Sequence, residues 1–141
     1  MQTSTRFAVA DHSLTLLAQA SGGPLVSEEI AGSVNTNPVV IRRVLGYLRR
    51  AGLVASQPGA RGGWTLVRAP GAIGLRDVYC AVERDPLLAL HERPNPACPV
   101  GRNIQQTLDS IFSDAQAALE QSLGGVTVAD VLQGVLARAS G

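Results

Sequence analysis

Lysine is absent from this chain of 141 residues, so all 12 of its basic side chains are arginines. The absence is typical of a GC-rich genome and excludes nothing by itself. Arginine differs from lysine in its planar guanidinium, which can hold a phosphate or a base edge through two hydrogen bonds. Cysteine is scarce as well. Cys80 and Cys98 are too few for a disulfide framework, and we expect both thiols to be reduced in the cytoplasm.

Long hydrophobic runs are also missing. No apolar run approaches the roughly 20 residues of a membrane helix, so we expect no membrane contact. The N-terminal segment lacks the layout of a signal peptide, because Asp11, His12 and Ser13 interrupt its apolar residues. We interpret His12 as a surface histidine. The hydrophobic content of 45% with 16% charged residues is typical of a globular protein, and the length allows either one core or a small domain with a dimerisation extension.

The motifs of enzymes are lacking too. The sequence contains no P-loop, no nucleophile elbow and no Ser-His-Asp grouping, so we expect no enzymatic activity and assign no catalytic residue. His91, Glu92 and Cys98 lie close together along the chain, but their spacing matches no established metal-ligand pattern. We interpret them as solvated loop residues and expect no metal site.

One stretch of the chain lacks carboxylates. Between Arg42 and Arg68 there are six arginines and neither aspartate nor glutamate. Residues 1–70 hold seven arginines against three acids, a net charge of +4, whereas residues 71–141 hold five arginines against eight acids, a net charge of −3. The whole chain carries only +1. This division of charge indicates that the first half meets a polyanion and that the second half has another task.

The first part of the chain has the pattern of three short helices. A first helix is predicted over residues 4–20, and a second from Ser27, as its N-cap, to about residue 34. After a turn, Asn37 is expected to cap a third helix over residues 38–51. Its apolar stripe at helical spacing is formed by Ile41, Val44, Leu45 and Leu48. This order of elements predicts a helix-turn-helix motif.

A glycine-rich hairpin and a fourth helix follow. Strands are predicted over residues 53–56 and 64–67, with a tip between them that holds too much glycine to pack, and a helix over residues 75–83. Trp64 is expected in the core beneath the hairpin. The predicted fold class is therefore mostly α, of the α+β kind: a winged helix-turn-helix domain with a two-strand wing and a long C-terminal dimerisation helix.

That long helix is predicted from about Pro99 to Leu123. Its stripe steps by four and three residues, as in a coiled-coil seam, through Ile104, Leu108, Ile111, Ala115, Ala118 and Ser122. We favour a homodimer joined along this stripe; the alternative is packing onto the chain's own domain. The predicted organisation is a DNA-binding domain at 1–83, a proline-rich linker and candidate sensor loop at 84–99, and a dimerisation helix at 100–141 with a last helix that packs back on the domain.

The predicted site for double-stranded DNA is the third helix together with the wing. A recognition helix lies in the major groove with its N-terminal residues nearest the base edges. The candidates for base contacts are Thr36, Asn37, Val39, Val40, Arg42 and Arg43. Further along the same face, the candidates are Tyr47, Arg49 and Arg50, of which the two arginines are expected to contact phosphates. Arg61 at the tip of the wing is expected to meet the minor groove or the backbone.

Helix-turn-helix, wing and long helix in this order resemble the Rrf2 family of bacterial winged-helix transcription regulators, and within it the YwnA-like branch. The segments that carry the resemblance are STRFAVA from Ser4, SEEIAGSVNTNPVVIRRVL from Ser27, LRRAGLV from Leu48, GARGGWTL from Gly59, LRDVYCAVE from Leu75 and NPACPVGRNIQ from Asn95. The resemblance covers essentially the full chain. It implies a homodimeric transcription regulator, in our interpretation a repressor, that binds a palindromic operator by sequence.

Iron–sulfur members of that family use three cysteines in the loop before the long helix. The corresponding loop here contains only Cys98, and a [2Fe–2S] cluster normally has four protein ligands. We therefore expect no iron–sulfur cluster and no other cofactor. The resemblance implies the fold and DNA binding without implying the cofactor.

Cys98 is nevertheless the candidate redox sensor. As the N-cap of the long helix its thiol would face unpaired N–H groups, which lower a thiol pKa, and Arg93 and Arg102 would act in the same direction. The alternative, held as equal, is a small capping or packing residue. Cys80 is expected to be buried. The expected signal is an unidentified small molecule or oxidant. The alternative function for the whole chain is an effector-binding or protein-binding winged-helix module without specific DNA recognition.

Overall fold

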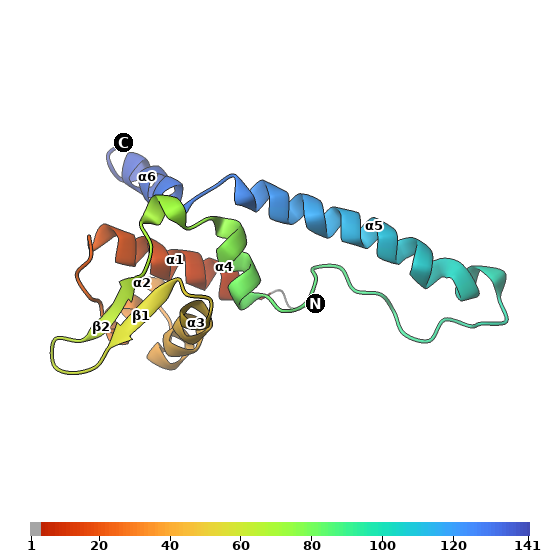
Figure 1. Ribbon diagram of the computed structural model, residues 1–141, viewed down its shortest axis with the longest axis horizontal. Coiled ribbons are helices and arrows are strands. Elements are labelled where there is room, and N and C mark those ends of the chain that lie inside the picture. The colour runs from red at the N-terminus through yellow and green to blue at the C-terminus, as the bar shows by residue number, and fades with distance from the viewer. Residues whose placement is uncertain (1–3) are drawn as a thin grey trace.

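A computed structural model describes residues 4–141 and has the predicted winged helix-turn-helix architecture (Figure 1). The elements in chain order are α1 Arg6–Gln19, α2 Ser27–Val34, α3 Pro38–Arg50, β1 Val54–Gln57, β2 Gly63–Leu66, the short 3-10 turn η1 Pro70–Ala72, α4 Leu75–Val82, α5 Pro99–Gly124 and α6 Val128–Ala139. Helices α1 to α4 and the hairpin form one body, from which α5 extends as a rod (Figure 1). The prediction of a mostly α fold with a two-strand wing is confirmed.

The core lies where α1, α3 and α4 pack against one another. The predicted stripe of α3 is fully buried there. It meets Leu14 and Leu17 of α1 and Val78 and Val82 of α4 in one continuous apolar cluster. At its edge the ring of Phe7 stands against the ring of Tyr79, edge to face, with 5.3 Å between their centres. Each fully buried aliphatic side chain contributes roughly 1.5–3 kcal/mol, so this cluster fixes the orientation of α3.

The start of α2 differs from the prediction. The N-cap is Val26, and Ser27 is the first helical residue. The carboxylate of Glu29 accepts the N–H of Val26 at 3.1 Å, as in one half of a capping box. Valine has no side-chain oxygen for the other half, and the N–H of Glu29 donates to the carbonyl of Val26 at 3.1 Å. The hydroxyl of Ser27 is instead used in the core, where it accepts the indole N–H of Trp64 at 3.2 Å. Serine at this position therefore joins α2 to the wing, a long-range role that capping preference does not reveal.

Both ends of α3 follow from local sequence. The side-chain oxygen of Asn37 accepts the N–H of Val39 at 2.8 Å, and Pro38 occupies the first helical position, as predicted. At the other end Gly52 has φ +77, a conformation that favours glycine. Its N–H donates to the carbonyl of Arg49, and the N–H of Leu53 donates to the carbonyl of Leu48. These two bonds close the helix end in a Schellman motif.

The wing is an antiparallel pair in which Val54 lies opposite Leu66. Both strands differ by one residue from the prediction. The first begins one residue later because the N–H of Leu53 donates to the end of α3, and the second begins one residue earlier, with Gly63 opposite Gln57. Trp64 exchanges two backbone hydrogen bonds with Leu25, and its partly buried ring packs against the core, as predicted. Gly63 has φ +143, and a Cβ there would come within 2.7 Å of the carbonyl oxygen of Leu25. Only glycine fits this position without strain.

Helix α5 rests on α4 along one side only. The predicted stripe divides: Ile104 and Leu108 are partly buried, whereas Ile111 remains 55% exposed and the three small residues after it are also exposed. Packing onto the chain's own domain therefore occupies a neighbouring strip of the helix, which includes Phe112 and Leu119. Most of the predicted seam is left uncovered within one chain.

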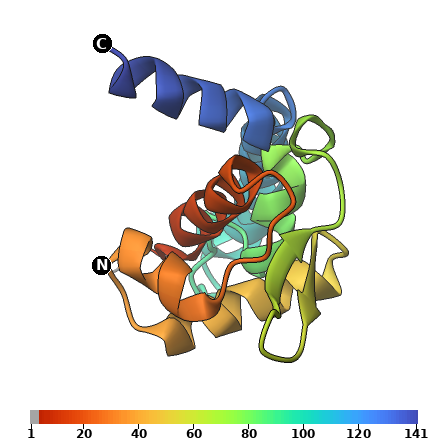
Figure 2. The same ribbon diagram turned by 90° about the vertical axis from the view of Figure 1, so that its left-hand side faces the viewer.

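Helix α6 returns to the domain, contacts α1, and points its C-terminal end away from the domain (Figure 2). Its start is attached to the segment before α4 by two backbone hydrogen bonds, from Val128 to the carbonyl of Ile73 and from Leu75 to the carbonyl of Val126, both 2.9 Å long. Val128 is buried in the main core. None of the helices within residues 4–141 combines the length and apolar character that a membrane-spanning helix requires.

Candidate nucleic-acid interface and sensor loop

The outermost ridge of α3 is opposite its buried stripe. By helical spacing it consists of Val39, Arg43, Gly46 and Arg50. Val39 is 55% exposed although it is apolar, and Arg43 and Arg50 are exposed. Gly46 is buried, and the guanidinium of Arg50 lies over it, 3.7 Å from the place where its Cβ would stand. The ridge therefore presents one apolar group and two guanidiniums, which suit a groove that offers methyl groups, acceptors and phosphates.

The flank of α3 toward α2 and the wing carries the other two arginines. Arg42 forms an ion pair with Glu28 of α2, with 2.8 Å between Nη2 and Oε1, and both side chains are exposed. Exposed pairs of this kind contribute at most about 1 kcal/mol, so a phosphate or a guanine can replace Glu28 as the partner. The guanidinium of Arg49 lies 5.9 Å from the centre of the Trp64 ring. Trp64 thus orients Arg49 from within the wing.

The opposite flank of α3 contains Tyr47 and, beside it, Arg84 of the linker, which the sequence did not predict at this site. Tyr47 is partly buried, and its ring has the guanidinium of Arg50 at 5.2 Å and that of Arg84 at 5.4 Å. Arg84 is the first residue of the linker, 37 positions after Tyr47 in the printed sequence. Nothing in the local sequence shows that α4 delivers it to α3. The contact adds a basic group beside the predicted site and connects the linker to the helix.

The turn before α3 supplies the remaining candidates. The side-chain oxygen of Asn37 is already used in capping, so its amide N–H₂ is the group left to meet a base. Thr36 is partly buried, and its N–H donates to the carbonyl of Ala31 at 3.1 Å. Val40 is partly buried on the flank of Tyr47. These contacts hold the turn in a fixed shape in front of the recognition ridge.

The tip of the wing carries Arg61 on an exposed turn. Gly59 has φ +103, and its carbonyl accepts the N–H of Gly62 at 3.0 Å. A Cβ on Gly62 would clash with the carbonyl oxygen of Gln57. The glycines therefore make a narrow tip for one guanidinium. Figure 2 shows the hairpin and α3 on the same lower side of the molecule, with α6 on the upper side.

Charge is uncompensated along this side. Among the ion pairs formed within residues 4–141, none involves Arg43, Arg49, Arg50 or Arg61. Arg42 has Glu28 as a partner, and Arg68 lies 3.9 Å from Asp77. The predicted DNA-contacting arginines of α3 and the wing thus come together on one face with a single carboxylate beside them.

Cys98 lies at the N-cap of α5, as its position before Pro99 suggested. Its exposed thiol faces the start of the helix, and the backbone N–H groups of Gly101 and then Val100 lower the pKa of the thiol below its ordinary value. The cause is the backbone and not the arginines that we expected to contribute. A Cβ on Gly101 would clash with the carbonyl oxygen of Asn95, so glycine allows the loop to fold against the helix end.

Cys80 is exposed, contrary to the prediction of burial. Its Sγ–H donates to the carboxylate of Glu120 at 3.4 Å. Partial desolvation, then the hydrogen bond and the charge of Glu120, raise the pKa of this thiol. The two thiols of the chain are therefore opposite in kind, and only Cys98 is favoured as a thiolate.

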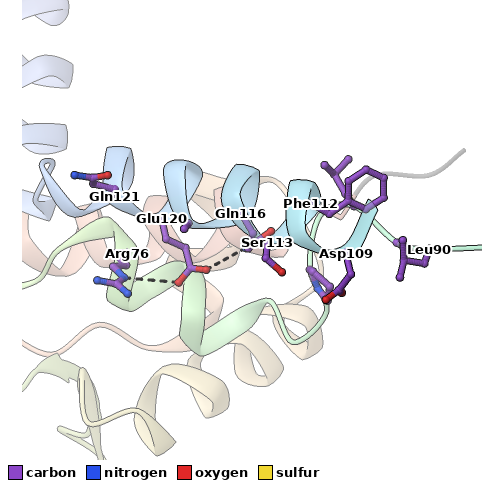
Figure 3. A pocket seen from close by; sticks show the side chains of 12 residues that line it. Arg76, Leu90, Asp109, Phe112, Ser113, Gln116, Glu120 and Gln121 are labelled. Atoms are coloured by element: carbon purple, nitrogen blue, oxygen red, sulfur yellow. Dashed lines mark hydrogen bonds and ion pairs between the residues drawn. The ribbon is translucent and has the colours of Figure 1, made fainter. Parts of the chain in front are cut away.

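The linker runs along α5 and leaves a cavity of about 710 Å³ beside it (Figure 3). In this cavity Glu120 lies between Arg76, at 3.6 Å, and the amide of Gln116, at 3.3 Å. Two hydrogen bonds attach the linker to the helix: the N–H of Leu87 donates to Gln116 at 3.1 Å, and the amide of Gln105 donates to the carbonyl of His91 at 2.7 Å. The segment that ends at Cys98 thus contacts both α3, through Arg84, and α5.

Comparison with known proteins identifies the family. The model of the Rrf2 family, described as an iron-dependent transcriptional regulator, matches residues 3–134. The chain belongs to the Rrf2 family of transcriptional regulators. It is 43% identical over 130 residues to YwnA of Bacillus subtilis, which is named as a helix-turn-helix-type transcriptional regulator, and the match covers 92% of this chain and 96% of YwnA. The members are regulators and not enzymes, in agreement with the lack of catalytic motifs.

Solved structures agree with this assignment. A crystal structure described as that of a DNA-binding protein has 39% sequence identity and a TM-score of 0.73, covering 90% of this chain and 98% of that one. The cysteine regulator CymR of B. subtilis has 25% identity and a TM-score of 0.69, covering 94% of this chain and 97% of CymR. The winged-helix Rrf2 fold of this chain is thereby established.

The family description implies iron, but the residues present do not fit an iron–sulfur cluster. The linker contains one thiol, that of Cys98, and the thiol of Cys80 in α4 is hydrogen-bonded to Glu120. No three histidine, cysteine or acidic side chains gather into a metal-binding group in the part of the chain that the structure describes. A cluster with a single thiolate lacks the ligands that such centres require.

Proposed function

We propose that this Rrf2 regulator is a homodimer that binds a palindromic operator in double-stranded DNA by sequence and represses transcription. The observation that carries the proposal is the exposed face of α3: among the ion pairs within residues 4–141, Arg42 on the flank pairs with Glu28, and none involves Arg43, Arg49 or Arg50. A helix of this kind in the major groove, with a basic wing beside it, is the docking geometry of winged helix-turn-helix proteins.

The position of each residue on α3 and the wing decides whether we assign it to base contacts or to phosphate contacts. Base edges are read by the start of α3, where Arg43 is on the outer ridge and Arg42 is on the flank. The set proposed for base contacts is Thr36, Asn37, Val39, Val40, Arg42 and Arg43. The set proposed for phosphates and the minor groove is Tyr47, Arg49, Arg50 and Arg61. Bidentate pairing of an arginine with guanine gives roughly 1–3 kcal/mol of discrimination, whereas a phosphate contact gives affinity alone.

Dimerisation is proposed through the uncovered strip of α5. Val100, 68% exposed, and Ile111, 55% exposed, lie on the same side of the helix with small residues after them. Two copies that pair these strips bury apolar surface that one chain leaves in water. The corresponding organisation of the chain is 1–83 for DNA, 84–99 as the sensor loop and 100–141 for dimerisation.

The proposed signal is oxidation or modification of Cys98, without an iron–sulfur cluster. The lowered pKa of Cys98 and its exposure favour reaction with an oxidant. A modified thiol at the N-cap would disturb the loop, which contacts α3 through Arg84. Because the proposed ligand is chromosomal DNA, the proposed place of action is the cytoplasm.

Fluorescence anisotropy with the DNA upstream of the chain's own gene tests the proposal. We expect tight binding that survives an excess of nonspecific competitor and weakens steeply with salt, since phosphate contacts release counterions. Binding that disappears on addition of competitor would contradict sequence recognition at this DNA. It would favour a module that binds an effector or another protein instead.

A further inference from the structure

A second cavity, of about 650 Å³, lies between α1 and α6 and reaches the end of α2. Its size is within the range of small-molecule sites. The wall from α6 is apolar and consists of Val131, Leu132 and Val135. The opposite wall from α1 includes Asp11 and His12. The cavity is separate from the DNA-contacting face, and neither the helix-turn-helix nor the thiol loop accounts for it.

Asp11 is the unusual residue of this cavity. Its Oδ1 is buried and has no hydrogen-bond partner among the described residues. Desolvation raises the pKa of this carboxyl to about 7. Buried polar oxygens in folded proteins nearly always have a partner, and the lack of one costs free energy. Asp11 as a whole is only partly buried and lines the cavity, and its Oδ2 is not among the buried unpartnered atoms. Oδ2 is therefore the oxygen that a donor in the cavity can reach, while the burial of Oδ1 leaves the carboxyl poorly solvated.

Two further polar side chains, Thr15 and Gln19, line the cavity. The hydroxyl of Thr15 donates to the backbone carbonyl of Asp11, and neither side chain is hydrogen-bonded to the buried Oδ1 of Asp11. The ionisable side chains that line it are Asp11 and His12, and no arginine is among them. The Nε2 of His12 is 2.9 Å from the hydroxyl of Ser33 in α2, so this nitrogen is already engaged. The α6 wall offers no charge and no hydrogen-bonding side chain at Val131, Leu132 or Val135.

We propose that this cavity binds a small organic cation, an ammonium group on an apolar chain or ring. The ammonium would donate to the carboxylate of Asp11, and the apolar part would lie against Leu132 and Val135. A charged hydrogen bond in a partly desolvated site is stronger than a neutral one. An anion would be repelled by Asp11, and a neutral alcohol would leave its charge uncompensated.

The position of the site couples it to the elements of the proposed function. The pair of His12 and Ser33 joins α1 to α2 just before the turn that leads into α3. Helix α6 directly follows α5, along which we propose that two chains pair. A ligand between α1 and α6 therefore contacts both the DNA-reading and the dimerising parts. This coupling rests on the proposed function, whereas the binding site does not.

The test is an NMR titration of the full chain with n-hexylammonium at pH 8, compared with hexan-1-ol and hexanoate. We expect saturable shifts in the amide signals of α1 and α6 with hexylammonium, and affinities about tenfold lower or weaker still for the alcohol and the carboxylate. Affinity for hexylammonium should fall several-fold at pH 6, where Asp11 with its pKa of about 7 is mostly protonated. Equal affinity for hexylammonium and hexanol, or no saturable shift in α1 and α6, would overturn the proposal.

Two variants and a control complete the test. Asp11→Asn keeps the shape and should abolish the preference for hexylammonium, whereas Asp114→Asn, an exposed carboxylate of α5, should leave it unchanged. Val135→Trp should fill the cavity from an exposed position and weaken binding while Asp11 remains. Unchanged affinity in both cavity variants would refute the site. Anisotropy with operator DNA in the absence of hexylammonium then separates the claims: a chain that fails to bind the operator while the NMR result holds counts against the proposed function alone.

Discussion

At the scale of single residues, the arginines of α3 differ in which neighbour already holds them. Arg42 forms an ion pair with Glu28. The guanidinium of Arg49 contacts the ring of Trp64, and that of Arg50 contacts the ring of Tyr47. Arg43 takes part in none of the ion pairs and ring contacts of residues 4–141. Arg43 is also on the outer ridge near the start of the helix, where base edges are closest. We therefore expect it to contribute more to sequence discrimination than the others.

Arg43→Ala and Arg49→Ala should separate base reading from phosphate contact. Arg43→Ala should reduce the difference in binding free energy between operator and random DNA by about 1–3 kcal/mol, the range of one bidentate base contact. Arg49→Ala should weaken both DNAs alike and reduce the salt slope by about one. Anisotropy titrations at several salt concentrations measure both quantities. Equal losses on the two DNAs for Arg43→Ala would mean that this residue contacts phosphate.

Cys98 and Cys80 form a matched pair of thiols with opposite pKa shifts. Backbone N–H groups lower the pKa of Cys98, and desolvation with Glu120 raises that of Cys80. Iodoacetamide at pH 7, followed by mass spectrometry, should alkylate Cys98 several-fold faster. Mild peroxide should change the DNA affinity of the native chain and of Cys80→Ser, but not of Cys98→Ser. A response that persists in Cys98→Ser would remove Cys98 as the sensor.

Asp11 should make stability depend on pH. Its pKa is raised in the folded chain from 3.8 to about 7, so the ionised form is disfavoured by folding. The resulting loss of stability is absent below pH 3.8, grows as the pH rises, and is complete above about 7. Asp11→Asn should therefore raise the free energy of unfolding at pH 8 by about 1–2 kcal/mol, reduced from the full shift because the group is only partly buried.

Urea unfolding of Asp11→Asn at pH 5 and pH 8 measures this effect, with Asp114→Asn as the control for loss of a surface carboxylate. The gain at pH 5 should be smaller than at pH 8. A gain that is equal at both values would show that Asp11 does not titrate between them.

At the scale of elements, the sequence predicted best where a local signal ends a helix. Asn37, Pro38 and Gly52 fix the bounds of α3 through short-range bonds, and the structure agrees with the prediction within one residue. The first strand begins one residue later than predicted because the N–H of Leu53 closes α3, a local bond that the strand pattern overlooked. Ser27 lies inside α2, where its hydroxyl accepts the indole N–H of Trp64, a contact between elements that local patterns do not contain.

The same limit applies to the candidate site. Helical spacing identified the exposed face of α3, since that face is opposite a buried stripe. It did not identify Arg84 beside Tyr47 or Glu28 beside Arg42, because both contacts depend on how separate helices pack. The cavity at Asp11 was missed for the same reason.

The backbone conformation of Gly63 in the wing leads to a prediction about stability. Gly63→Ala should lower the free energy of unfolding by about 1–3 kcal/mol, because φ is +143 and a Cβ would meet the carbonyl of Leu25. Gly71→Ala is the matched control, since the space around its Cβ is open. Chemical denaturation compares the two, and DNA affinity should fall only for Gly63→Ala. Equal stability of both variants would show that the wing adapts to a side chain at position 63.

The exposed strip of helix α5 leads to a prediction about dimerisation. Ile111→Glu should convert the dimer to a monomer with an unchanged circular dichroism spectrum, because Ile111 is 55% exposed within one chain. Gln106→Glu places the same charge on an exposed position of the same helix outside the strip and should leave the dimer intact. Light scattering coupled to gel filtration measures the molar mass of the native chain and of both variants. A native chain that is already monomeric at micromolar concentration would refute dimerisation through α5.

At the scale of the whole molecule, charge and shape are divided in the same way. The basic first half forms the compact domain with its arginines on one face, and the acidic second half begins within that domain and continues into the linker, α5 and α6 (Figure 1). Two domains joined through α5 would present two copies of α3 to one duplex. Inverted half-sites about one helical turn apart, or a multiple of it, are the expected operator geometry.

Selection of bound duplexes from a random pool, with an excess of unlabelled nonspecific DNA, is the measurement that most directly tests sequence-specific binding by a dimer. We predict that successive rounds enrich one inverted repeat, and that the repeat is not enriched by the variant in which both Arg42 and Arg43 are alanine. Binding that enriches no sequence, or a single half-site without its inverted partner, would contradict the proposed function.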